Sequence, residues 1–166
     1  QDAVPIRLGQ EFAAYAVAVR RSRKWLEMAA FELEESGIGG SAAGTGLNTH
    51  PKYRFMVAKN LREYTGIEFY CADDMREAMQ SQFCMSALAA SLRLFCLELT
   101  RITNDLRLLC SGPLTGLAEI TLPAVQPGSS IMPGKVNPSM AENMNLVLFQ
   151  VLGQCAAIDY CVQAGQ

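Results

Sequence analysis

The 166-residue chain is poor in charge and in histidine. Charged residues make up 18% of the sequence and sum to a net charge of −2, and His50 is the single histidine. A nucleic-acid-binding domain would carry an excess of lysine and arginine. A disordered segment would have fewer apolar residues than this chain, in which they make up 50%. The composition therefore predicts a folded domain without a nucleic-acid partner.

The sequence also lacks the cysteine spacings of a metal site or a disulfide scaffold. Its six cysteines include no Cys-x-x-Cys pair. Most of them lie in apolar, helix-like runs, so we expect small buried side chains in a reducing compartment, the cytoplasm. No metal and no cofactor is predicted. The first residues include neither an initiator methionine nor a signal sequence, and we expect a segment from inside a longer protein.

Alternating apolar and polar residues, typical of strands, are nearly absent, and helical periodicity dominates. The pattern predicts helices over about 9–35, 51–64, 74–110 and 138–163. Residues 67–71 are the only extended stretch, too short to build a sheet. The run 74–110 contains neither glycine nor proline and predicts a straight or bent rod about 55 Å long. A rod of this length needs neighbours of similar length, so the expected fold class is all-α, a bundle of long helices.

The last predicted helix is unusually poor in charge. After Glu142 its only charged residue is Asp159, which suggests a membrane span. Polar residues recur along it, among them Asn143, Asn145 and Gln150, and such groups are costly in lipid. We therefore expect no membrane and a helix buried inside an oligomer.

Two glycine-bearing segments suggest nucleotide binding, and neither fits. Residues 37–42 match G-x-G-x-x-A, but they follow a charged helix where the dinucleotide fingerprint requires a strand. In residues 128–135 five residues separate the glycines, whereas a Walker A loop has four. A serine–histidine triad has little support either, because His50 is expected on the surface beside a helix.

The segment 111–137 holds four prolines and four glycines, and a loop this long is usually functional. In it Ser129 and Ser130 precede Lys135 and Asn137. Asn137 is the expected N-cap of the last helix, with Pro138 at its first position. The start of a helix and a lysine together favour an anion. Two interpretations remain open: an anion site with an activated serine, or a structural turn with an N-cap.

The string GSSIMPGKVNP at 128–138 resembles the fumarase/aspartase superfamily signature G-S-S-x-M-P-x-K-x-N-P at every fixed position. Residues 39–49 resemble the family's glycine-rich turn, and 104–113 resemble the segment that leads into its signature loop. The resemblance implies an antiparallel bundle of long helices at the core of a homotetramer. Residues 1–166 would then be part of that central domain, with the N-terminal and C-terminal domains of the enzyme outside this chain.

The resemblance implies a reversible anti-elimination with fumarate as a common product, acting on a small dicarboxylate or amino acid. Ser129 matches the family's catalytic base. Ser130, Lys135 and Asn137 match residues that bind substrate carboxylates, and Glu142 matches an acid near the site. One departure is Leu114, where close relatives often carry arginine.

Short strings suggest a branch of the family. The ending VQAGQ at 162–166 and DLRLL at 105–109 resemble aspartate ammonia-lyases, which implies release of ammonia from L-aspartate. Hydration of fumarate is the alternative. A hypothesis of another class is that the segment serves only as an oligomerisation bundle.

Overall fold

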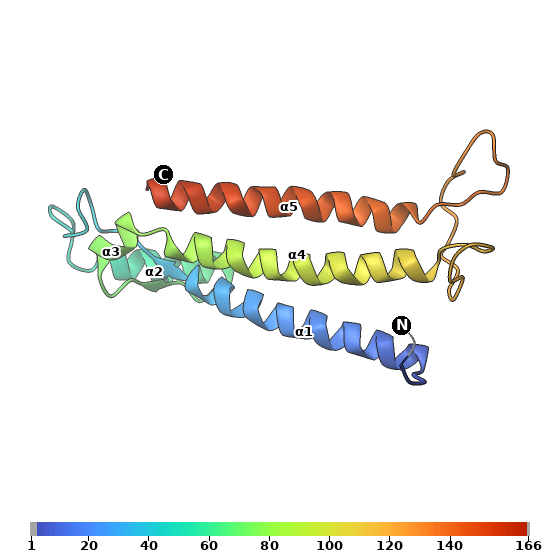
Figure 1. Ribbon diagram of the computed structural model, residues 1–166. Coiled ribbons are helices and arrows are strands. Elements are labelled where there is room, and N and C mark those ends of the chain that lie inside the picture. The colour runs from blue at the N-terminus through green and yellow to red at the C-terminus, as the bar shows by residue number, and fades with distance from the viewer. Residues whose placement is uncertain (1–2, 166) are drawn as a thin grey trace. The chain divides into compact units, whose positions relative to one another are not determined.

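The computed structural model describes residues 3–165 and consists mostly of long helices (Figure 1). The helices are α1 (Leu8–Glu32), α2 (Tyr53–Thr65), α3 (Met75–Gln80), α4 (Phe83–Leu109) and α5 (Ser139–Ala164), and two-residue strands β1 (Glu35–Ser36) and β2 (Tyr70–Cys71) complete the elements. The expected all-α class is confirmed. Gln166, the last residue of the string VQAGQ, lies outside the described residues.

The chain divides into two compact units. The first, here the loop unit, comprises the chain up to Arg23 together with Leu92–Gln154. The second, the turn unit, comprises Lys24–Ser91 and the chain from Cys155 onward. The helices α1, α4 and α5 each contribute residues to both units, and each unit is described by itself below.

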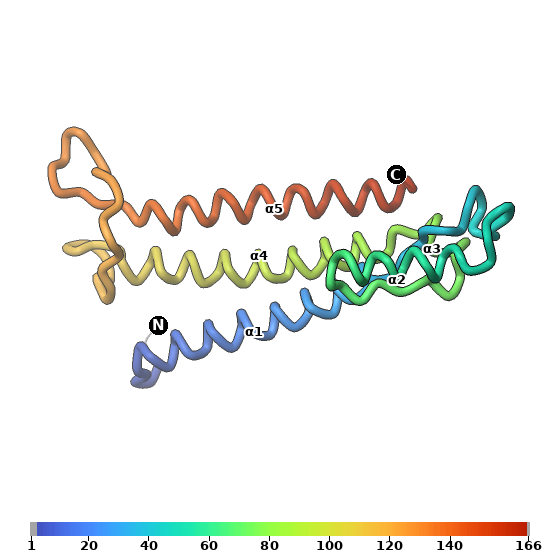
Figure 2. Tube along the Cα trace, turned by 180° about the vertical axis from the view of Figure 1, so that it is seen from behind, coloured from blue at the N-terminus to red at the C-terminus, as the bar shows by residue number. Residues whose placement is uncertain are grey.

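In the loop unit, α4 and α5 lie side by side and run antiparallel (Figure 2). Asn145 Nδ2 of α5 donates a hydrogen bond of 2.8 Å to Asn104 Oδ1 of α4. One turn further along α4, Arg107 Nη2 lies 3.9 Å from Glu142 Oε1, which is one turn earlier in α5. These two pairs fix the helix direction and the register.

The first helix contacts α4 through its inner face. Residues of α1 that are buried or half-buried recur at helical spacing, from Tyr15 through Ser22. The guanidinium of Arg101 on α4 lies 5.6 Å from the centre of the Tyr15 ring. The basic residues expected on the solvated face of α1, Arg20, Arg21, Arg23 and Lys24, are all exposed.

The expected 37-residue rod is interrupted after its first helical turns. Its beginning is the separate short helix α3, and α4 starts only at Phe83. Ser81 between them is extended, with φ −88° and ψ 132°. Its hydroxyl oxygen accepts a hydrogen bond of 3.3 Å from the N–H of Phe83, an interaction typical of a helix start. A serine that caps the next helix thus ends the run, and α4 has 27 residues, about 40 Å.

The end of the first helix also differs from the expectation. Helix α1 ends at Glu32, and Glu35 lies in β1, which pairs in parallel with β2. The extended stretch at 67–71 therefore does find a partner strand, because Glu35 aligns with Tyr70 and Ser36 with Cys71. This pair joins the end of α1 to the segment after α2 within the turn unit.

The chain exposes more surface than a compact monomer of its size. Its accessible surface is 12019 Å², whereas a globular monomer of 18.1 kDa exposes about 8,100 Å². Exposed apolar side chains on α5 include Met140, Leu146, Phe149 and Tyr160. By length and composition alone, α4 and α5 could each cross a membrane, a test that core helices of soluble bundles also pass.

The cysteines are only partly as expected. Cys96 and Cys155 are buried, as small apolar side chains would be. Cys71, Cys84 and Cys110 are half-buried, and Cys161 is exposed. Among the residues from 3 to 165 no group of histidine, cysteine or carboxylate side chains is placed to hold a metal ion.

Candidate active site

The signature loop, residues 128–138, closes on itself through its main chain. The N–H of Gly128 donates a hydrogen bond of 2.8 Å to the carbonyl of Lys135, and the N–H of Lys135 donates one of 3.1 Å to the carbonyl of Met132. A side-chain carbon at Gly128 would lie 2.8 Å from the Lys135 carbonyl oxygen, so glycine permits the closure. Ser129 therefore lies near Lys135 in space although the two are six positions apart.

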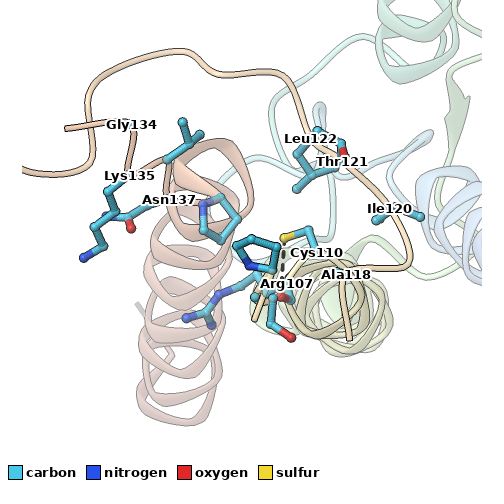
Figure 3. Close-up of a pocket in the computed structure, with 14 residues that line it drawn as sticks. Arg107, Cys110, Ala118, Ile120, Thr121, Leu122, Gly134, Lys135 and Asn137 are labelled. Carbon is cyan, nitrogen blue, oxygen red and sulfur yellow. Dashed lines mark hydrogen bonds between the residues drawn. The ribbon is translucent and has the colours of Figure 1, made fainter. Parts of the chain in front are cut away.

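A cavity of about 530 Å³, here cavity A, lies where the loop meets the end of α4 (Figure 3). Lys135 and Asn137, two of the predicted site residues, line it. Arg107 of α4 lines it as well, and the sequence analysis did not single out this residue. The other lining residues are Cys110, Ser111, Gly112, Pro113, Ala118, Ile120, Thr121, Leu122, Gly134, Val136 and Pro138. With two cations and no carboxylate among these residues, cavity A suits an anion.

Ser129 lies on a different depression, here cavity B, of about 460 Å³. Lys135 lines both cavities, whereas Ser129 lines only cavity B. The hydroxyl oxygen of Ser129 accepts a hydrogen bond of 3.3 Å from the N–H of Ile131. The predicted base therefore shares cavity B with Lys135, but it does not line cavity A, where Lys135 and Asn137 lie.

The remaining predicted residues lie further out. Ser130 is exposed and lines neither cavity. Glu142, in the first turn of α5, faces Arg107 at 3.9 Å, and both side chains are more than 40% exposed. An ion pair this exposed is screened by water and contributes little stability. Leu114 is 95% exposed and also lines neither cavity.

The start of α5 is one residue later than expected. The helix begins at Ser139, and the carbonyl of Pro138 accepts the helical hydrogen bond from the N–H of Glu142 at 3.0 Å. Asn137 contributes its main-chain carbonyl, which accepts from the N–H of Ser139 at 2.8 Å. Pro138 thus occupies the N-cap position and Asn137 precedes it, which leaves the Asn137 side chain on the wall of cavity A.

Arg107 is hydrogen-bonded to the amide pair that joins α4 and α5. Its Nη1 donates a hydrogen bond of 3.2 Å to Asn104 Oδ1, the same atom that accepts from Asn145 Nδ2. Asn145 is 5% exposed, whereas Asn104 and Arg107 are exposed to solvent. One sequence signal pointed here: Arg107 lies in the segment 104–113 that resembles the family's approach to the signature loop.

The comparisons with known proteins agree on one family. Residues 1–153 match a family described as lyase. The chain is 48% identical over 166 residues to an aspartate ammonia-lyase of Bacillus subtilis, covering all of this chain and 35% of that protein. It is 39% identical over 165 residues to a class II fumarate hydratase of Bacillus cereus, covering 99% of this chain and 36% of that protein. The crystal structure of a class II fumarase from Schistosoma mansoni superimposes with a TM-score of 0.96 at 31% identity, covering all of this chain and 38% of the other. The chain thus spans about a third of the length of these relatives.

Proposed function

Because this chain belongs to the lyase family, we propose that it is part of the central domain of an enzyme that converts L-aspartate to fumarate and ammonia. The observation that carries this choice of substrate is the 48% identity to an aspartate ammonia-lyase over the whole chain, against 39% to a class II fumarate hydratase. The signature loop and cavity A are consistent with a dicarboxylate substrate, because two cations line that cavity.

In the proposed reaction Ser129 acts as the base. Its alkoxide takes the proton from C3 of L-aspartate, and the electron pair left behind is first delocalised into the adjacent carboxylate, which then carries an additional negative charge. The pair next forms the C2–C3 double bond, the C2–N bond breaks, and ammonia leaves. The serine hydroxyl returns its proton to water before the next turnover.

The positive groups of the loop would stabilise the alkoxide of Ser129 and the additional negative charge on the substrate carboxylate. Lys135 lines the depression of Ser129 as well as cavity A, and the N–H groups at the start of α5 carry the positive end of the helix dipole. Preorganised groups of this kind usually make the largest contribution to catalysis. Lys135, Asn137 and Ser130 would bind the substrate carboxylates. Glu142 would support the site through its contact with Arg107.

This proposal requires the loop to move. Ser129 lies on cavity B and Ser130 is exposed, so both must approach cavity A when substrate binds. Closure of a loop that excludes water and completes a catalytic set is a common step in enzymes. The chain that the relatives have in addition would supply the remaining walls.

The direct test is release of ammonia from L-aspartate by the full-length protein, measured in a coupled assay. L-malate is the matched substrate, and formation of fumarate is followed by absorbance. Fumarate with stoichiometric ammonia from L-aspartate is the expected result. Fumarate formed from L-malate, with none from L-aspartate, would identify the alternative, a fumarate hydratase.

We also propose that the exposed apolar side chains of α5 are covered in a homotetramer in the cytoplasm. The support is the surface of 12019 Å², far above that of a compact monomer, together with the long charge-poor sequence of α5. The isolated 166 residues should be helical and self-associate without lyase activity, serving alone only as an oligomerisation bundle. Circular dichroism, light scattering and the fumarate assay test these three expectations separately.

A further inference from the structure

The turn unit contains a cavity that the proposed reaction does not use. Its volume is about 390 Å³, and it lies between the glycine-rich turn and the start of α2. Its lining residues are Gly39, Gly44, Thr45, Gly46, Thr49, His50, Pro51, Arg54 and Met75. None of them is acidic, whereas Arg54 is a permanent cation.

Arg54 lies half-buried in the wall of this cavity without a carboxylate to balance it. Within residues 3–165 its guanidinium forms no ion pair, although other arginines of this unit do, such as Arg76 with Asp74 at 2.6 Å. The guanidinium carbon lies 4.7 Å from the centre of the Phe55 ring, which holds the group by a cation–π contact. A half-buried cation of this kind is more stable with an anion beside it.

His50 adds a hydrogen-bond donor to the same wall. Its Nδ1 accepts a hydrogen bond of 3.1 Å from the N–H of Lys52. An imidazole nitrogen that accepts carries no hydrogen, so in the neutral ring the hydrogen is on Nε2. The imidazole thus offers a donor even when it is uncharged.

The backbone around this cavity shapes it in two ways. Helix α2 starts without a side-chain cap, since Lys52 at the N-cap makes no such hydrogen bond. The N–H of Tyr53 donates to the carbonyl of His50 at 2.8 Å, and the next two N–H groups, those of Arg54 and Phe55, form no hydrogen bond within residues 3–165. Gly39, at φ +110°, lets the turn pack against Arg54, because a side-chain carbon there would lie 2.7 Å from the Cβ of Arg54. The turn is therefore built around this arginine.

From the cavity, the unbalanced guanidinium, the imidazole donor and the uncapped helix start, we propose that the turn unit binds a small oxyanion, a phosphate or a carboxylate, separately from the active site. Arg54 provides the charge and His50 Nε2 a hydrogen bond. The buried side chain of Met75 closes one wall against water. This site does not depend on the chemistry proposed for Ser129.

The test measures anion binding by the full-length protein with the active site disabled. Inorganic phosphate and succinate are titrated calorimetrically at constant ionic strength into the Lys135→Met variant, which lacks a cation of cavity A. We expect saturable binding of at least one of the two, and the anion that saturates identifies the chemical class. Adding Arg54→Gln should weaken that binding about tenfold or more, as for the loss of a charge-assisted contact.

A matched control comes from the same helix. Arg62 is exposed on α2 and does not line the cavity, so Arg62→Gln in the Lys135→Met background should leave the affinity unchanged. His50→Gln should weaken binding by a smaller factor than Arg54→Gln. Equal affinity with and without Arg54→Gln would overturn the proposal. So would the absence of saturable binding of both anions at millimolar concentration, since the cavity would then be filled by protein.

Discussion

The substitution Gly128→Ala tests whether closure of the signature loop positions the reacting groups. The added methyl carbon would lie 2.8 Å from the carbonyl oxygen and 3.1 Å from the carbonyl carbon of Lys135. Real side-chain carbons essentially never approach other atoms below 3.0 Å. The obstacle is main chain, so it cannot rotate away as a flexible side chain would. Either Lys135 moves by a few tenths of an ångström or the loop opens.

The free-energy cost of Gly128→Ala is limited by the cheaper of these responses. Opening the loop forfeits the hydrogen bond of 2.8 Å between Gly128 and Lys135, and an ordinary hydrogen bond contributes about 1 kcal/mol. We therefore expect the free energy of unfolding to fall by about 1 kcal/mol. The rate should suffer far more, because a displacement of about 1 Å at a catalytic group can cost about a hundredfold.

The assay compares kcat, KM and Tm of the full-length protein with those of Gly128→Ala and of Gly153→Ala. Gly153 lies within α5 and outside the signature loop, with nothing of this chain within 4 Å of an added carbon, so alanine there should leave the rate unchanged. A Gly128→Ala variant with normal kcat and KM would refute the reasoning, because the closure would then not position Ser129 and Lys135.

Three further predictions concern the signature loop and the ion pair between Asp74 and Arg76. Ser129→Ala should lower kcat by orders of magnitude while Tm changes little, since a loop serine contributes little stability; near-normal turnover would remove Ser129 from the mechanism. Lys135→Met should weaken inhibition by succinate about tenfold to a hundredfold, with unchanged inhibition showing that the carboxylate is held elsewhere. The side chain of Arg76, hydrogen-bonded to Asp74, holds the pKa of that carboxyl well below its ordinary value. Ionised Asp74 therefore stabilises the fold at neutral pH, and this contribution is lost as pH falls below about 4. The Tm difference between the wild type and Asp74→Asn should then shrink between about pH 4 and pH 2, and a constant difference would contradict the assignment.

The sequence predicted the long helices because their apolar periodicity is local and persistent. It missed the break at Ser81 because no glycine or proline marks it: a serine hydroxyl that accepts from Phe83 N–H ends one helix and starts the next. It missed the strand pair because Glu35 and Tyr70 meet only in three dimensions. Local patterns carry no information about such pairings.

The sequence likewise identified some residues of the candidate site and missed others. The motif identified Lys135 and Asn137, which the structure places on one cavity. It could not show that Ser129 faces another depression, since this depends on the fold of the loop. Arg107 and Arg54 were not singled out because an isolated arginine in a helix has no distinguishing pattern. Only the folded structure shows that each of them lines a cavity.

The amide pair between α4 and α5 makes this end of the loop unit sensitive to changes in chain length. Asn104 and Asn145 fix the rotation of the two helices, and Arg107 is placed three residues beyond that point. Deleting one residue between Asn104 and Arg107 would turn the arginine by about 100° around the helix axis and away from Glu142. Related sequences should therefore vary in side chains here yet keep the spacing from Asn104 to the loop without insertions or deletions.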